Sequence, residues 1–144
     1  KVERLIRTIQ QDFEATLRCM EATRFDSAFM FKYSPRRGTV AAGRPDDVPP
    51  PEKQRRLAAV IALQRGITAE RSAEFLGLEV EVLVDGVSPR GGGMVVGKTR
   101  EFKSAVMPGD PAQIGTLRRM RVTETRGVTL TGVPAGTEAA VPAA

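Results

Sequence analysis

Residues Leu78 to Val84 alternate apolar and acidic side chains, in the order Leu-Glu-Val-Glu-Val-Leu-Val. A period of two places the apolar side chains on one face of an extended strand and the acids on the other. Asp85 and Gly86 follow and have the chemistry of a tight turn. The stretch predicts a strand with one buried face that ends at this turn.

Four more short apolar segments follow, each bounded by Gly or Pro. They are Met94–Val96, Phe102–Met107, Leu117–Val122 and Val128–Leu130. About five short strands at this spacing are typical of a barrel or sandwich. We therefore predict that residues 78–133 form a small β-barrel.

Composition narrows the functional classes. The chain has 144 residues, one cysteine and no histidine, so it can form no internal disulfide and lacks the usual proton shuttle. No apolar run is long enough to span a bilayer. We expect a cytoplasmic monomer without a membrane partner, and no metal site or catalytic residue in this chain. The first residues lack a secretory signal, which predicts that they lie inside a longer protein.

Positive charge is concentrated in the barrel region. Between Val87 and Arg126 there are eight basic and three acidic residues, a net charge of +5. A basic face on a small barrel is typical of nucleic-acid binding, because phosphate contacts supply sequence-independent affinity; the alternative is an ordinary solvated surface. On a strand Arg119 and Arg121 project together, away from the core. The predicted RNA-binding residues are Lys98, Arg100, Lys103, Arg118, Arg119, Arg121 and Arg126.

The first part of the chain predicts a helix and a strand. Asp12 can cap a helix that runs to about Thr23, with Phe13, Leu17 and Met20 in one apolar stripe. We expect Cys19, beside this stripe, to be a small buried residue. Residues 27–33 are apolar on both faces until Lys32, which predicts a strand from a larger parallel sheet.

A loop with two arginines follows this strand. Active-site groups of α/β barrels lie where strands end, so Arg36 is a candidate anion or substrate contact, with an exposed loop arginine as the alternative. The candidate substrate-side loop residues are Tyr33, Ser34, Arg36 and Thr39. A proline-rich connector over 41–51 and a helix from Glu52 to Leu76, capped by Gly77, lead to the barrel.

Gly92 to Thr99 match the letter pattern of a phosphate-binding P-loop. Such a loop needs a helix that opens at the lysine. Pro108 and Gly109 would end that helix almost at once, and Val95 and Val96 favour a strand. We predict a loop and a strand here. A nucleotide-binding enzyme that uses Lys98 and Thr99 is a minor alternative.

These residues together resemble the C-terminal part of the MiaB-type tRNA methylthiotransferases, radical S-adenosylmethionine enzymes that end in a TRAM domain. The resemblance covers most of the chain. It rests on Asp12–Leu17, Tyr33–Thr39 with Ala41 and Ala42, Leu63-Gln64, Glu70-Arg71, Gly77, Val80–Val84, Gly97–Arg100, Pro108-Gly109 and Ile114-Gly115.

The resemblance implies both an organisation and a function. Residues 1–42 would be the last helix and strand of a radical barrel, and 43–70 a connector with a linker helix. Residues 71–133 would be a TRAM domain, a small antiparallel OB-like β-barrel that grips the anticodon arm of tRNA, and 134–144 a disordered tail. The implied fold class is α+β. The full-length enzyme would add a methylthio group to an N6-isopentenyl-type adenosine, with two [4Fe–4S] clusters and S-adenosylmethionine. Those clusters need cysteines that this chain lacks, so the chain alone should bind no cofactor and be inactive.

Two departures from the family pattern and two alternatives remain open. The family has proline at Arg37, and a strand that it carries between Ile9 and Asp12 is missing, which leaves the radical barrel unable to close. Sister enzymes that modify a ribosomal protein or another tRNA adenosine share the pattern. The chain could also be a stand-alone RNA-binding protein.

Overall fold

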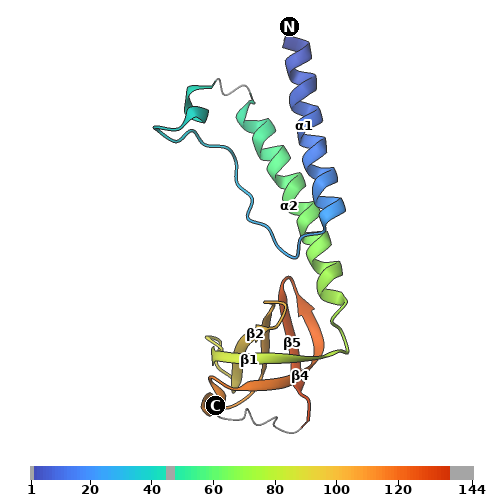
Figure 1. The fold of residues 1–144 in the computed structure, drawn as a ribbon, viewed down its shortest axis with the longest axis vertical. Coiled ribbons are helices and arrows are strands. Elements are labelled where there is room, and N and C mark those ends of the chain that lie inside the picture. The colour runs from blue at the N-terminus through green and yellow to red at the C-terminus, as the bar shows by residue number, and fades with distance from the viewer. Residues whose placement is uncertain (1, 45–47, 137–144) are drawn as a thin grey trace. The chain divides into compact units, whose positions relative to one another are not determined.

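The computed structural model describes residues 2–44 and 48–136, with side chains from Gln10 onward (Figure 1). These residues form two compact units that divide after Ile67. The elements of the first unit and the connecting helix are α1 (Val2–Thr23), a short 3-10 helix η1 (Val40–Gly43) and α2 (Pro50–Ala73). The barrel consists of β1 (Glu79–Val87), β2 (Met94–Thr99), β3 (Ser104–Pro108), the 3-10 helix η2 (Pro111–Gln113), β4 (Leu117–Arg126) and β5 (Thr129–Pro134).

The five strands close into a barrel in the order β1-β2-β3-β5-β4 (Figure 1). This confirms the predicted α+β fold with a small β-barrel. One pair differs from the antiparallel expectation, because β3 and β5 run parallel while the other four pairs are antiparallel. A closed ring with an odd number of strands cannot alternate direction all the way round, so one parallel pair is unavoidable.

Two strands run further than their sequence patterns predict. The turn expected at Asp85 and Gly86 is instead a bulge, since the pairing of β1 with β2 shifts between Val84 and Gly86 and then continues to Val87. At the other end, β5 reaches Pro134, and the N–H of Ala135 donates to the carbonyl of Arg119 at 2.9 Å. The predicted tail therefore begins later than Pro134, and residues 137–144 lie outside the described part.

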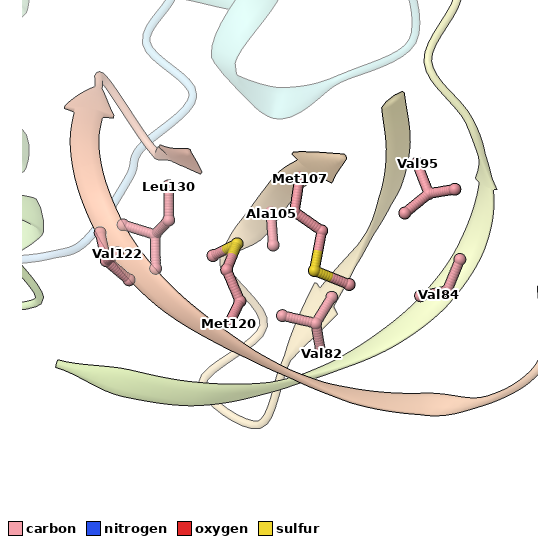
Figure 2. Packing of buried hydrophobic residues seen from close by; sticks show 8 residues of the cluster. All are labelled: Val82, Val84, Val95, Ala105, Met107, Met120, Val122 and Leu130. Atoms are coloured by element: carbon pink, nitrogen blue, oxygen red, sulfur yellow. The ribbon is translucent and has the colours of Figure 1, made fainter. Parts of the chain in front are cut away.

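Alternate residues of the strands fill the barrel (Figure 2). The eight side chains drawn there are each at most 2% exposed, which makes them the core of this unit. They are Val82, Val84, Val95, Ala105, Met107, Met120, Val122 and Leu130. Close packing of this kind leaves the outward residues of the same strands available for binding.

The last turn of α2 belongs to the barrel unit. Ser72 is fully buried, and its hydroxyl donates to the carbonyl of Gly127 at 2.7 Å. Phe75 packs against the core, and the N–H of Gly77 donates to the carbonyl of Val122 at 2.9 Å. The helix ends at Ala73, earlier than the predicted Leu76, because residues 74–77 turn to make these contacts.

In the first unit, α1 and the first part of α2 run side by side in the same direction (Figure 1). The predicted start of α1 at Asp12 is wrong, because the helix continues through it from Val2. Met20 of the predicted stripe is buried. Cys19 is exposed, contrary to expectation, with its Sγ 3.9 Å from Oγ1 of Thr23. One step along a helix turns a side chain by about 100°, which carries Cys19 off the buried stripe.

The predicted strand at 27–33 does not form. Residues 27–36 have no regular secondary structure, and Phe29 and Phe31 are 95% and 83% exposed. A strand needs a neighbour for its backbone hydrogen bonds. All the strands among the described residues lie in the barrel unit, so this apolar segment has no sheet to join.

Candidate nucleic-acid interface

The candidate interface is the outer surface of β4, β1 and β2, which lie next to one another in that order. Met120 and Val122 point into the core, while Arg119 and Arg121 between them are exposed, as strand alternation predicts. We call this surface the β1 face. It consists of Glu79 and Glu81 from β1, Lys98 and Arg100 from β2 and the turn after it, and Arg119 and Arg121 from β4.

Two of the arginines on the β1 face form ion pairs with β1. Nη2 of Arg121 lies 2.7 Å from Oε1 of Glu79, and Nε of Arg100 lies 2.7 Å from Oε2 of Glu81. Both arginine side chains remain more than half exposed. Exposed pairs contribute only about 0–1 kcal/mol, so a phosphate can compete for these guanidinium groups.

Arg119 lies opposite Glu81 in the register of β4 and β1. No ion pair is found for Arg119 among the described residues, in contrast with Arg100 and Arg121. Arg119 lines a shallow hollow of about 260 Å³ together with Glu79, Val80 and Glu81. Of the arginines on this face, Arg119 therefore offers its charge to a ligand at the lowest cost.

The acidic residues of β1 lower the net charge of the barrel. The sequence count of +5 began at Val87, but Glu79, Glu81 and Asp85 belong to the same barrel. From Glu79 to Pro134 there are eight basic and six acidic residues, a net charge of +2. Only +2 of the chain's net charge of +5 therefore lies between Glu79 and Pro134. The positions of the individual basic side chains matter more for RNA binding than the total charge of the barrel.

The hairpin turn between β2 and β3 adds an aromatic side chain to this surface. Phe102 is 80% exposed, and Nζ of Lys98 lies 5.2 Å from the centre of its ring. Nζ of Lys98 also donates to the hydroxyl of Ser104 at 2.9 Å. The apolar pattern placed Phe102 in a strand, so sequence reasoning missed it as a site residue. An aromatic residue between Arg100 and Lys103 was the available signal.

The other predicted RNA-binding residues lie in different surroundings. Lys103 is only 5% exposed, and its Nζ lies 5.1 Å from the centre of the Phe75 ring. This corrects its assignment to the exposed face: Lys103, directly before β3, has the same strand parity as the buried Ala105, and its side chain points toward the turn after α2. Arg118 is half-buried at the same strand parity as Met120, and Arg126 is exposed at the far end of β4.

The predicted substrate-side loop lies in the first unit. The hydroxyl of Tyr33 donates to the carbonyl of Ala41 at 2.9 Å, and Oγ1 of Thr39 donates to the carbonyl of Arg36 at 2.8 Å. Thr39 also caps η1. Ser34 and the side chain of Arg36 are exposed. These bonds connect the loop to η1 and close its turn, and the side chain of Arg36 stays exposed.

The segment with the P-loop letter pattern forms a loop and a strand, as predicted. Gly91, Gly92 and Gly93 all have positive φ, between 64° and 75°, and strand β2 begins at Met94. Thr99, which a P-loop would use to bind Mg²⁺, is 5% exposed and accepts a hydrogen bond from the N–H of Lys103. The helix that the nucleotide-binding alternative requires at Lys98 is replaced by strand.

The described residues contain no group of three or more His, Cys, Asp and Glu side chains that could hold a metal ion. The whole chain has one cysteine. The residues present therefore do not fit a [4Fe–4S] cluster, which needs several cysteine ligands. None of the helices in the described ranges is long and apolar enough to cross a membrane.

Comparison with known proteins gives one consistent result. The chain is 43% identical over 123 residues to the tRNA-2-methylthio-N(6)-dimethylallyladenosine synthase of Thermoanaerobacter sp. (strain X514), covering 85% of this chain and 26% of that protein. Synthases of the same name from Chlorobium phaeobacteroides (strain BS1) and Phocaeicola vulgatus are 44% and 41% identical, over 87% and 85% of this chain. No family model matches.

These matches confirm the predicted resemblance to the tRNA methylthiotransferases. The chain spans only about a quarter of the length of the relatives, between 26% and 28% of each. The matched residues cover 85% or more of this chain, so the similarity includes parts of both units.

Proposed function

We propose that this chain is the tRNA-binding part of a radical S-adenosylmethionine methylthiotransferase, and that its barrel is the TRAM domain of that enzyme. The observation that carries the proposal is the similarity of 40–44% identity to relatives named for 2-methylthio-N6-dimethylallyladenosine in tRNA. These names favour the isopentenyl-type adenosine over the substrates of the sister enzymes. The chemistry would belong to the rest of the cytoplasmic enzyme, which would hold the clusters and S-adenosylmethionine.

The β1 face supports a role in tRNA binding. Arg100, Arg119 and Arg121 are exposed on adjacent strands, and Lys98 lies beside them. Arginine guanidinium groups pair with phosphate through two hydrogen bonds at once, which suits contact with an RNA backbone. The two β1 carboxylates keep the arginines extended across the strands when no RNA is bound.

The first unit would meet the missing part of the enzyme. Phe29 and Phe31 are almost fully exposed in a segment without regular structure. Exposed apolar side chains of this size are typical of surfaces that another part of a protein covers. In the complete enzyme this segment would be a strand of the radical barrel, and the loop that carries Tyr33, Ser34, Arg36 and Thr39 would face its active site.

The test is the binding of the 144-residue chain to a labelled tRNA anticodon stem–loop, measured by fluorescence anisotropy at several salt concentrations. If about three phosphates are met, log affinity should fall with log salt at a slope of roughly −2, from about 0.7 per contact. An acidic protein of the same size as the RNA serves as a competitor. Failure to bind the stem–loop at low salt would reject the proposal. So would displacement of the labelled stem–loop by the acidic protein as effectively as by unlabelled stem–loop.

A further inference from the structure

We propose that Phe102 is a stacking platform for an unpaired RNA base, flanked by Lys98 and Arg100, which contact the adjoining phosphates. This inference rests on the proposed function, which it deepens by assigning a base contact to a surface otherwise described by its charge. It concerns the turn that joins β2 and β3, residues 100–103.

The backbone of this turn has an unfavourable conformation at Phe102. Phe102 has a φ of 62°, the left-handed region, where Gly or Asn is expected. A bulky residue there is a true outlier, and such outliers cluster at functional sites. Only one other described residue that is not glycine, Arg24, has positive φ. Glycine would adopt this φ without the steric cost that phenylalanine carries.

The turn is nevertheless well defined. The N–H of Thr99 donates to the carbonyl of Lys103 at 3.0 Å, and the N–H of Phe102 donates to the carbonyl of Thr99 at 3.0 Å. The N–H of Lys103 also donates to Oγ1 of Thr99 at 3.3 Å. The ring is therefore presented from a fixed base, and a partner that binds it has less backbone entropy to remove.

Packing does not explain the aromatic ring. Phe102 is 80% exposed and is absent from the eight-residue core and from the side chains packed against it. Its one aromatic contact among the described residues is with Nζ of Lys98, at 5.2 Å. An exposed cation–π contact of this kind is weak and does not offset the cost of the positive φ.

Chemistry and charge together point to nucleic acid as the partner. Aromatic side chains beside basic residues bind single-stranded RNA, since every base has a face that can stack. Lys98 and Arg100 place positive charge on the same hairpin as the ring. A docking protein segment would more often meet an aromatic residue within an apolar patch, whereas Lys98 lies over the Phe102 ring and the exposed residues just before it, Arg100 and Glu101, are charged.

The experiment compares wild type with Phe102→Ala, Phe102→Leu and Phe102→Tyr in the 144-residue chain. The probe is an anticodon stem–loop that carries 2-aminopurine in its loop. The proposal predicts that Ala and Leu each lower affinity roughly 5- to 150-fold, the range for loss of one stacked base. Tyr should bind like wild type. The salt slope should not change in any variant, because no charge is removed.

Quenching of 2-aminopurine supplies a second readout. It should accompany binding to wild type and Phe102→Tyr and be lost with Phe102→Ala and Phe102→Leu. Thermal unfolding checks folding, and Phe102→Gly should be at least as stable as Phe102→Ala because glycine accepts the positive φ. Wild-type affinity for Phe102→Ala overturns this inference and leaves the proposed function standing, as does wild-type affinity for Phe102→Leu. No binding by the wild-type chain rejects both.

Discussion

Nη2 of Arg121 lies 2.7 Å from Oε1 of Glu79, its register partner across β4 and β1. The next outward pair along the same strands is Arg119 and Glu81, and Glu81 instead accepts a hydrogen bond from Arg100. Strand β1 thus carries a row of carboxylates between two rows of basic residues. The phosphates of an RNA that binds to this face must therefore compete with those carboxylates for the arginine side chains.

The double variant Glu79→Gln and Glu81→Gln should bind RNA more tightly than wild type. It removes the carboxylates that compete for Arg121 and Arg100, so the salt slope should steepen by about 1.4, from about 0.7 for each of the two guanidinium groups freed. Stability should change by less than about 1 kcal/mol, because both pairs are exposed. The single variants Glu79→Gln and Glu81→Gln are compared with Glu14→Gln on α1, which changes one charge outside the barrel. If the double variant binds RNA no more tightly than wild type, these carboxylates do not compete with RNA for the arginines of the β1 face.

Lys103→Ala should weaken the fold and leave the salt slope unchanged. Its ammonium lies over the Phe75 ring and is buried, so it can offer no phosphate contact. Loss of the packed stem should cost roughly 1–3 kcal/mol in urea denaturation. Lys98→Ala, at a half-buried lysine of the β1 face, is the comparison variant and should reduce the slope by about 0.7 with a smaller effect on stability. A flatter salt slope for a folded Lys103→Ala protein would show that Lys103 contacts the RNA after all.

Strand periodicity made the barrel predictable, while contacts between distant residues decided most of the errors. Alternation in β1 and β4 gave the buried and exposed residues correctly, because a period of two depends only on the local chain. Lys103 was misplaced because its partner, Phe75, lies far away in the sequence, in the turn after α2. Phe102 was missed because an apolar residue next to a strand pattern is read as its first member.

The failed strand at 27–33 has a different cause. Its apolar pattern is real, but a strand forms only when another strand satisfies its backbone groups. The described residues of the first unit contain no such strand. The role of Tyr33, Ser34, Arg36 and Thr39 as a substrate-side loop stays a prediction. The described residues of the first unit do not form the sheet at whose edge this loop would lie.

Gly97→Ala should unfold the barrel, and Gly66→Ala should not. A Cβ at Gly97 would overlap the carbonyl of Leu83 and the side chain of Val82 on β1. At Gly66, inside α2, a Cβ meets nothing within 4 Å, and alanine should add about 0.5–1 kcal/mol of helix stability. Circular dichroism during thermal unfolding separates the two. A stable Gly97→Ala barrel would mean that β2 and β1 are less closely packed than described.

Acid should weaken the first turn of α2. Hydrogen bonds from Arg55 and then Arg56 lower the pKa of Glu52 to about 2 from its ordinary value of 4.5. A lowered pKa means that the carboxylate stabilises the fold fully above pH 4.5 and that this contribution is lost as pH falls toward 2. Carbon-detected NMR titration of the Glu52 carboxyl group measures this. A midpoint near 4.5 would show that the arginines do not hold it.

The salt dependence of RNA binding by Arg119→Ala, Arg121→Ala and the double variant tests the central claim most directly. We predict a slope of roughly −2 for wild type, a flatter slope for the double variant and an unchanged unfolding midpoint. Arg119→Ala should have the larger single effect, because Arg121 is already paired with Glu79. An unchanged affinity and slope in a folded double variant would contradict the account, since the β1 face would then be only a solvated surface.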